Sequence, residues 1–287
     1  MNLVFRELSL EDLPEINKLS KSMDMRNDPK IGEIAENLIQ DPKCLLYGAY
    51  DGPILVGVGG LREKFENFAW IEDIRVHGQH QKKGVGTALF QYGEDLAKER
   101  GFTRVAYQTV TENKGSCRIG EKLGYERKHE MVAFWMRPKK APKVDKKYLE
   151  QNPLPADEAL RKLAKFPEGP KEEICIGWSY SPFEAEYYNN DPEKNFYSSG
   201  DTVMLDFIDR SIATQKIDCA KAILYGSKEN VKELLYGFFA RNKKLDVILL
   251  CLCPENLVSE VLEVGFKYAN VWTGNNNIVV MFDKKLK

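Results

Sequence analysis

Apolar residues recur with period two before a short glycine-containing loop and with a helical period after it. Residues Trp70–Val76 alternate Ile74 and Val76 with polar neighbours, which is typical of a half-buried strand. From Val85 to Leu96, apolar residues recur at helical spacing, and a glycine follows where helices often end in left-handed conformation. The pattern therefore predicts a strand, a loop and an amphipathic helix in succession.

The loop has the composition of an anion-binding turn. It reads Gln81-Lys82-Lys83-Gly84-Val85-Gly86. Glycine lets the main chain approach a ligand closely, and the unpaired amides of a first helical turn suit a diphosphate. Gly-x-Gly alone is a weak signal, because a loop can need glycine only to turn into a helix, and the longer dinucleotide-binding fingerprint is absent. The neighbouring strand and helix favour the diphosphate site.

The same kind of pattern continues downstream. Residues 104–110 alternate Val105, Tyr107 and Thr109 as a strand, and residues 111–113 lead into a short helix that ends at Leu123-Gly124. A strand over residues 131–136 is expected to close the unit.

This succession resembles the GNAT acetyltransferase superfamily, whose pattern is strand, Gln/Arg-x-x-Gly-x-Gly/Ala, helix, strand, Asn, helix and a Leu-Gly-Phe/Tyr ending. The resemblance covers about the first 137 residues. It implies an α+β fold with a mixed sheet, acetyl-CoA as cosubstrate and no metal. Strands that splay apart leave main-chain groups to which the amides of pantetheine can bond.

The resemblance also implies a set of binding residues. Main-chain groups of Ile74, Arg75 and Val76 would meet the thioester and the pantetheine arm. Asn113 and Ser116 match the second motif as secondary binding positions; both residue types also cap helix starts, and capping is compatible with a contact to the CoA arm. The diphosphate would lie on the main-chain amides of Gln81, Lys82, Lys83, Gly84, Val85, Gly86 and Thr87.

Glu72 is the candidate general base. Period-two alternation places its side chain on the strand face of Ile74 and Val76, toward the acetyl group, and Asp73 on the opposite face. The alternative is a carboxylate that serves only in an ion pair. A modest base suffices for an α-amino group, whose pKa near ~8 leaves roughly one molecule in ten neutral at pH 7.

One position departs from the family pattern. The tyrosine that often protonates the CoA thiolate lies seven residues after the motif asparagine, and this chain has Gly120 there. Solvent can protonate the leaving thiolate, because a thiol of pKa ~8.5 is a fair leaving group. Tyr107, Tyr125 and His129 are the substitutes considered, each of which also reads as an ordinary strand or turn residue.

Charge and composition limit the classes of binding partner that the sequence implies. The 287 residues have a formal net charge of −1, and no stretch approaches the ~18 apolar residues of a membrane helix, so neither nucleic acid nor a membrane is implied. The start reads as a strand rather than a signal peptide, which predicts a cytoplasmic protein. Six cysteines are expected to be free thiols, and three histidines give little support to a metal site.

The second half suggests a degenerate copy of the first. A Pro- and Lys-rich start marks residues 138–172 as an exposed linker with a short helix at 156–163, after a first domain of residues 1–137. In residues 173–287, a glycine follows Asn242 by 23 residues, just as Gly124 follows Gly101. The phosphate-loop position reads Tyr225-Gly226-Ser227, which predicts no CoA binding. An unrelated α+β domain is the alternative, and a homodimer interface is one role considered.

Three functions stay open at this point. The first is transfer of acetyl to the amine of a small molecule, such as an amino acid, whose carboxylate Arg26 could bind. The second is acetylation of a protein N-terminus or lysine, and the third is a non-catalytic CoA-binding scaffold. Asp41-Pro42, a strand, and then Glu72 with Arg75-Val76 are also distantly similar to histidine Nα-acetyltransferase-like proteins.

Overall fold

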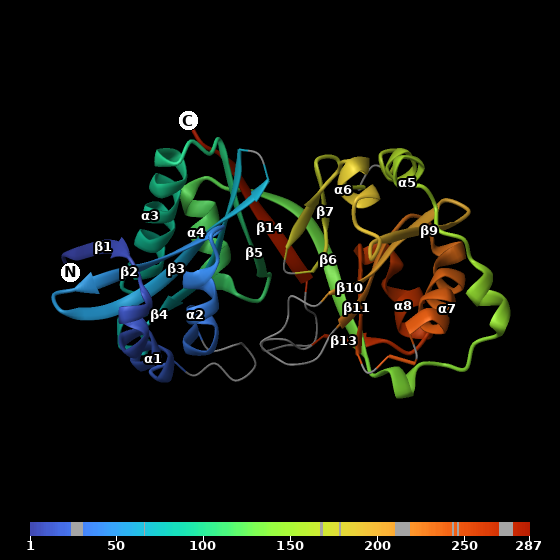
Figure 1. Ribbon diagram of the computed structural model, residues 1–287, viewed down its shortest axis with the longest axis horizontal. Helices are drawn as coiled ribbons and strands as arrows, with labels where there is room; N and C mark the ends of the chain where they lie inside the picture. The colour runs from blue at the N-terminus through green and yellow to red at the C-terminus, as the bar shows by residue number, and fades with distance from the viewer. Residues whose placement is uncertain are drawn as a thin grey trace. The chain divides into compact units, whose positions relative to one another are not determined.

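The computed structural model divides the chain into two compact units (Figure 1). Unit 1 contains Met1–Thr109, Asn113–Lys128 and Met281–Lys287, and unit 2 contains Val110–Glu112 and His129–Val280. Both chain ends therefore belong to unit 1. The structure describes residues 1–23, 31–65, 67–166, 169–177, 179–209, 219–242, 244–245, 247–269 and 278–287.

Unit 1 is a mixed sheet with helices on both faces. Its strand order is β1-β2-β3-β4-β5-β14, with β4 and β5 parallel. The strands are β1 (Leu3–Glu7), β2 (Cys44–Asp51), β3 (Ile54–Phe65), β4 (Phe68–Val76), β5 (Arg104–Val110) and β14 (Ile278–Lys285). The helices are α1 (Leu13–Lys21), α2 (Ile31–Gln40), α3 (Val85–Glu99) and α4 (Lys114–Leu123), with 3-10 turns at Leu10–Asp12 and Gly78–His80.

Alternation along β2 separates the two faces of this sheet. Leu46 belongs to a buried cluster with Ile16 of α1 and Ile31 of α2. Its neighbour Tyr47 points the other way, and its hydroxyl donates to the Leu89 carbonyl of α3 over 3.1 Å. Thus α1 and α2 cover one face, and α3 covers the other.

The strand after β5 in unit 1 is β14, from the far end of the chain. The sequence-based expectation that residues 131–136 close the first unit is wrong. Residues Val132–Met136 instead pair with β12 (Ile248–Cys253) of unit 2. The division by packing therefore differs from the expected boundary after residue 137, because each half of the chain supplies a strand segment to the other unit.

Unit 2 has the strand order β6-β12-β11-β10-β9 and a separate β7–β8 hairpin. Its other strands are β6 (Glu126–Met136), β7 (Glu173–Cys175), β8 (Tyr180–Pro182), β9 (Asn195–Ser199), β10 (Thr202–Asp209), β11 (Cys219–Tyr225) and β13 (Lys267–Tyr268). The helices are α5 (Ala156–Leu163), α6 (Ala185–Asn189), α7 (Val231–Asn242) and α8 (Val258–Glu263), with 3-10 turns at Pro138–Lys140, Lys146–Glu150, Lys228–Asn230 and Glu255–Leu257.

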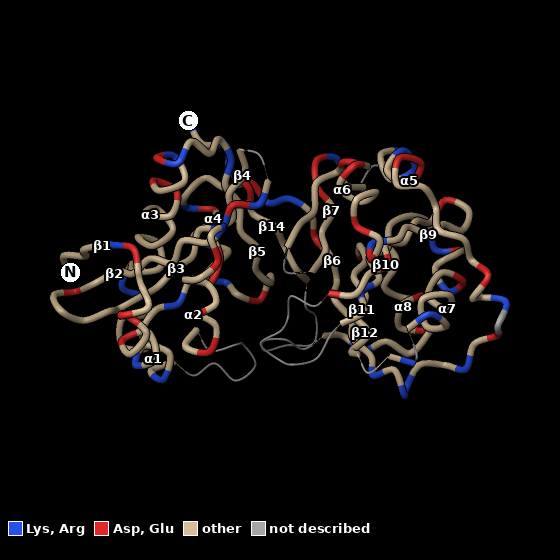
Figure 2. Tube along the Cα trace, viewed as in Figure 1, with Lys and Arg blue, Asp and Glu red and all other residues tan. Residues whose placement is uncertain are grey.

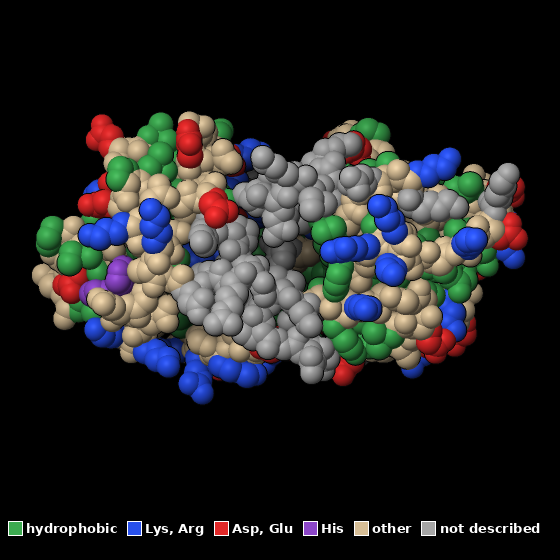
Figure 3. Space-filling view, turned by 90° about the horizontal axis from the view of Figure 1, so that it is seen from below, with side chains coloured by type: hydrophobic (Ala, Val, Ile, Leu, Met, Phe, Trp, Pro, Cys, Tyr) green, Lys and Arg blue, Asp and Glu red, His purple; other side chains and the backbone are tan. Residues whose placement is uncertain are grey.

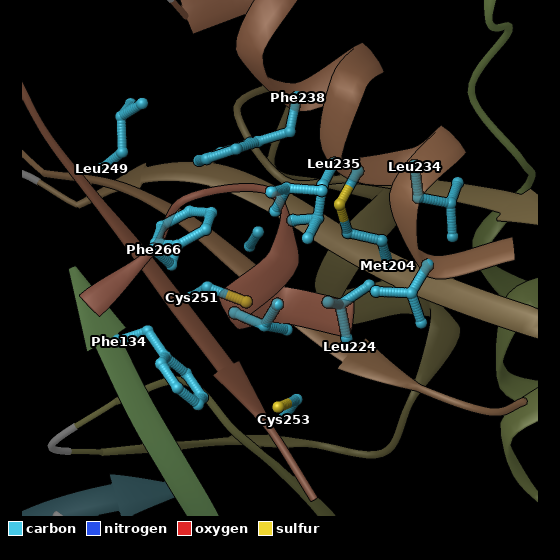
Figure 4. Close-up of a cluster of buried hydrophobic side chains, with 14 of the residues drawn as sticks. Phe134, Met204, Leu224, Leu234, Leu235, Phe238, Leu249, Cys251, Cys253 and Phe266 are labelled. Carbon is cyan, nitrogen blue, oxygen red and sulfur yellow. The ribbon is translucent and has the colours of Figure 1, made fainter. Parts of the chain in front are cut away.

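The core of unit 2 forms where α7 lies on the sheet. Leu234, Leu235 and Phe238 of α7 pack with Cys251 and Phe266 in one buried cluster (Figure 4). Apolar burial of this kind stabilises by about 1.5–3 kcal/mol per large side chain. Helix α7 therefore faces the core of unit 2.

The basic segment after β6 is partly buried, unlike the exposed linker that the sequence predicts. Figure 2 shows the lysines and arginines that follow this strand along the trace. Ala141 and Val144, however, pack against the core of unit 2, and Tyr148 meets the ring of Tyr236 edge-on at 5.3 Å. The helix expected at residues 156–163 is present as α5.

Candidate active site

Strands β4 and β5 pair over only part of their length. Their register joins Phe68–Trp70 to Arg104–Ala106, whereas β4 continues to Val76 and β5 to Val110. The main-chain edges beyond Trp70 and Ala106 therefore diverge in unit 1. An extended molecule with amide groups of its own can bond to such edges as a pseudo-strand.

An irregularity in β4 changes which side chains face this opening. Asp73 has a φ of 53°, in the left-handed region, and the β3–β4 register shifts between the Val58 and Gly60 positions. A β-bulge of this kind breaks period-two alternation. A Cβ at Gly60 would lie 3.2 Å from Glu72, whereas a Cβ at Gly59 would lie 2.6 Å from Ile74.

The expected shared face of Glu72 and Ile74 is therefore wrong. Adjacent strand residues point to opposite faces, so Glu72 lies on the α1–α2 face and Ile74 lies beside Tyr47 on the α3 face. Val76 stays on the α3 side, where it lies near Gly86. The bulge separates the carboxylate from the two apolar side chains.

Glu72 is largely buried and paired. Its Oε1 accepts from Arg62 Nε at 2.6 Å, and the Cys44 thiol lies 3.7 Å from the same oxygen. Burial raises the pKa of Glu72 above its ordinary value, and the Arg62 guanidinium acts in the opposite direction. The ion pair considered from the sequence is therefore present.

More charged groups surround this pair. Arg62 also forms a salt bridge with Asp41, which follows α2. The ammonium of Lys64 lies 5.8 Å from the centre of the Trp70 ring, and burial lowers the pKa of this lysine. Burial of the Cys44 thiol and the negative charge of the nearby Glu72 raise the pKa of this thiol to about 12, so the thiol stays protonated.

The loop before α3 has the backbone geometry of an anion-binding turn. Lys82 has a φ of 59° and Gly84 a φ of 89°, so two left-handed residues alternate with ordinary ones. Gly84 is the N-cap of α3 and provides no side-chain cap. The first helical amides, of Val85, Gly86 and Thr87, precede the first intrahelical bond, from Ala88 to the Gly84 carbonyl.

The loop and the start of α3 differ in exposure. The chain is exposed from Gln81 to Gly84, whereas Val85 is buried and anchors the helix start. The Gln81 side chain donates to the Val76 carbonyl at 3.4 Å, which ties the loop back to β4. Arg75 donates to the Ile74 carbonyl and lies 3.4 Å from Asp73.

Glycine is favoured at the two loop positions for different structural reasons. A Cβ at Gly84 would meet nothing within 4 Å, so only its left-handed backbone favours glycine there. A Cβ at Gly86 would lie 3.3 Å from Ile119 of α4 and 3.8 Å from Val76. Gly86 therefore permits close packing of α3 on α4, and its side-chain direction does not lead to the loop surface.

Two histidines lie beside this loop. The amide of Gln79 donates to His77 Nδ1 at 3.3 Å, and the His77 and His80 rings lie 5.5 Å apart. Gly78 donates to the Ser22 hydroxyl at the end of α1. Figure 3 shows histidine side chains on the surface of unit 1.

The second motif lies at the start of helix α4. The Asn113 side chain accepts from the Ser116 amide at 3.1 Å and caps α4. The Ser116 carbonyl accepts from the Tyr107 hydroxyl at 2.8 Å. Asn113 thus has the capping role considered from the sequence, a role that is compatible with a contact to the coenzyme arm.

Gly120 faces two aromatic rings. A Cβ there would lie 2.2 Å from the Tyr107 hydroxyl and 2.7 Å from the ring of Phe282. Tyr107 is 2% exposed, and burial raises its pKa far from the physiological range, as it does for Tyr125. His129 lies 3.6 Å from the buried Glu173 in unit 2. None of the three considered substitutes is placed as an accessible acid.

Gly120→Ala should destabilise unit 1 by about 1–3 kcal/mol, because the added methyl group overpacks a rigid aromatic contact. Denaturant unfolding measures this directly. The matched control is Gly115→Ala on the same helix, whose Cβ would meet only Asn113 at 3.6 Å. Equal stability of the two variants would contradict the packing described for Gly120.

Unit 2 has a different arrangement at the corresponding strands. β11 and β12 pair continuously from Cys219–Ile248 to Ile223–Leu252, so their main-chain groups are used in the sheet. Lys221 of β11 is buried, donates to the Ile176 carbonyl at 2.9 Å and pairs with Asp209. The opening and carboxylate of unit 1 thus have no counterpart among these described residues.

The described residues contain no group of three or more His, Cys, Asp or Glu side chains that could hold a metal ion, and none of their helices has the length and apolarity to span a bilayer. All six cysteines are free, and five are buried. Arg26, considered for acceptor binding, lies outside the described residues.

Part of the chain is similar to a known protein family. Residues 7–125 match the model of the acetyltransferase (GNAT) family. The streptothricin acetyltransferase of Escherichia coli is 31% identical over 86 residues, which are 30% of this chain and 48% of that protein. The chain spans at most 63% of the length of the curated relatives it matches, all named as acetyltransferases.

Solved structures extend the similarity to the whole chain at the level of fold. A putative acetyltransferase from Thermoplasma acidophilum has a TM-score of 0.60 at 14% identity and covers 99% of this chain and 100% of its own. A tandem GNAT protein from the clavulanic acid biosynthesis pathway has a TM-score of 0.55 at 12% identity, covering 99% and 98%. The tandem fold predicted from the repeat is therefore confirmed, and residues 7–125 are the part of the chain that is similar to the acetyltransferase (GNAT) family.

Proposed function

We propose that unit 1 is an acetyl-CoA-dependent N-acetyltransferase that acts on the amine of a small molecule, such as an amino acid. The observation that carries the proposal is the divergence of β4 from β5 in the unit that also holds the uncapped amides of α3. These features together fit a ligand that has a diphosphate at one end and an amide-containing arm at the other.

The coenzyme-binding roles follow from this fit. The amides of Val85, Gly86 and Thr87 would hold the diphosphate, with Lys82 and Lys83 adding positive charge. Main-chain groups of β4 from Ile74 to Val76 would bond to the pantetheine arm. Asn113 and Ser116 would support the arm indirectly, through the start of α4.

Glu72 would act as the general base. Its raised pKa keeps the proton affinity of the carboxylate closer to that of the amine, which suits proton transfer near neutral pH. The amine nitrogen forms a bond to the acetyl carbon, the carbon–sulfur bond breaks, and CoA leaves as thiolate. Water then protonates the thiolate, because Tyr107 and Tyr125 are buried.

The acceptor class is tested with a panel. Acetyl-CoA consumption is measured with free amino acids, polyamines and peptides, each at the same concentration. Turnover of small amines supports the proposal. Turnover of peptides alone would assign the protein to peptide or protein acetylation, and tight CoA binding without any turnover would leave a coenzyme-binding scaffold.

Arg62 should set the pH dependence of the reaction. Arg62→Gln removes the cation that opposes the raised pKa of Glu72, so this pKa rises further. The base is active only above its pKa. The acidic limb of the kcat/KM profile should therefore move to higher pH.

Two further variants separate positioning from general damage. Arg62→Lys keeps a cation and should leave the limb near its wild-type place. Asp41→Asn removes the other carboxylate that pairs with Arg62 and should not move the limb upward. An unchanged profile in Arg62→Gln, with normal CoA affinity, would show that Glu72 is not the titrating base.

A further inference from the structure

We propose that the edge of β5 with α3 and α4 is a strand-binding site whose occupant is the chain's own C-terminal segment, Met281–Lys287. Occupancy of this edge would hold β5 in the position needed for acetyl-CoA. The inference rests on the proposed function, because β5 is one of the two strands that open to receive the coenzyme.

An aromatic contact fixes the register of this segment. The ring of Phe282 stacks on Tyr107 with centroids 5.1 Å apart and planes within 7°. It fills the space beside α4 that the absent side chain of Gly120 leaves. Larger residues at either Gly120 or Phe282 would compete for the same volume, so the strand and the helix are matched in shape.

Two ion pairs fix the following residues. Asp283 accepts from Arg104 of β5 at 2.6 Å, and Lys284 donates to Glu94 of α3 at 2.6 Å. Asp283 and Glu94 are both buried. Opposite charges on consecutive residues thus meet two different elements of unit 1, and a one-residue slip would leave buried charges unpaired.

The main chain continues this recognition at the end of the segment. The Leu286 amide donates to the Thr103 carbonyl at 2.8 Å, just before β5 begins. The C-terminal segment is therefore held from Phe282 to Leu286 by contacts within unit 1.

The location of these contacts links them to the coenzyme site. β5 pairs with β4 only through Arg104–Ala106, so β4 does not hold the part of β5 from Tyr107 onward. Phe282 contacts Tyr107, the first residue beyond this pairing. The C-terminal strand thus supports the wall of the opening on the side away from β4, which gives the second half of the chain a role without a coenzyme loop of its own.

A charge exchange in the full-length protein tests the inference. Arg104→Asp and Asp283→Arg each place like charges together at a buried pair, and each should weaken acetyl-CoA binding at least ~30-fold. The double variant restores opposite charges and should bind within ~5-fold of wild type. Calorimetry gives the affinities, and amide hydrogen exchange reports the protection of Tyr107–Val110.

Matched variants keep the test decisive. Asp157→Arg breaks an exposed pair with Arg161 in unit 2 and should leave affinity unchanged. Phe282→Leu keeps an apolar side chain and folding, and should weaken binding ~5-fold with faster exchange at Tyr107. Single variants with deprotected β5 amides but wild-type affinity would overturn the inference, as would Phe282→Leu with unchanged affinity. Wild-type protein that binds no acetyl-CoA would instead contradict the proposed function.

Discussion

Aspartate in place of Gly84 should weaken acetyl-CoA binding about 100-fold, whereas asparagine at the same position should weaken it less than about 10-fold. The two side chains are nearly isosteric, and both tolerate left-handed backbone better than other residues do. They differ in charge. A carboxylate about 5 Å from a diphosphate at an effective dielectric constant near 20 costs about 3 kcal/mol for each phosphate charge, before screening by salt.

Gly84 is the sharper site for this test than Gly86. The Cβ of residue 84 would stand in open space, so the change adds charge at the loop without overpacking. Any side chain at Gly86 would first press on Ile119 and mix helix packing with binding. Calorimetric titration with acetyl-CoA measures both variants, and thermal unfolding checks that they remain folded. Equal affinities for the Asp and Asn variants would show that no diphosphate lies at this loop.

Glu72→Gln should lower kcat by about 10²–10⁴-fold while the affinity for acetyl-CoA stays within about twofold of wild type. Glutamine keeps the shape of the side chain and can still contact Arg62, but it cannot accept a proton from the amine. The rate of the variant should rise with pH up to about 9, because the acceptor must then lose its proton to solvent.

The control for this variant is Glu63→Gln, an exposed carboxamide on the neighbouring strand β3. It should retain wild-type kcat. Steady-state kinetics with the best acceptor of the panel measure both. A Glu72→Gln enzyme with wild-type kcat would leave this carboxylate as a structural partner of Arg62 and nothing more.

Local patterns predicted the elements around the site well. The strand before the loop, the helix from Val85 and the left-handed glycine at 101 are all present. These features depend on nearest neighbours in sequence, that is, on side-chain alternation, helical period and the special backbone freedom of glycine. The loop could therefore be located from the sequence alone.

The orientation of Glu72 could not be predicted in the same way. Period-two reasoning assumes a regular strand, and one bulged residue is enough to move every following side chain to the other face. Asp73 takes a positive φ in a stretch whose composition otherwise reads as ordinary strand. The bulge is evident from the backbone angle of Asp73 and from the register between β3 and β4, neither of which local sequence pattern gives.

Local sequence pattern also could not predict which strands lie side by side. Residues 131–136 and 278–282 are both short apolar strands, and either one could lie beside β5. The choice depends on Arg104 meeting Asp283, which lies 179 residues away, and on Phe282 filling the space beside Gly120. The sequence marked Gly120 as a missing acid, whereas its packing role needs two rings from distant segments.

A crystal structure of the protein with acetyl-CoA is the most direct test of the central claim. We expect density for the diphosphate on the amides of Val85–Thr87 and for the thioester between β4 and β5 beside Glu72. Coenzyme bound at another surface of the chain, or crystals that take up none at saturating concentration, would contradict the assignment.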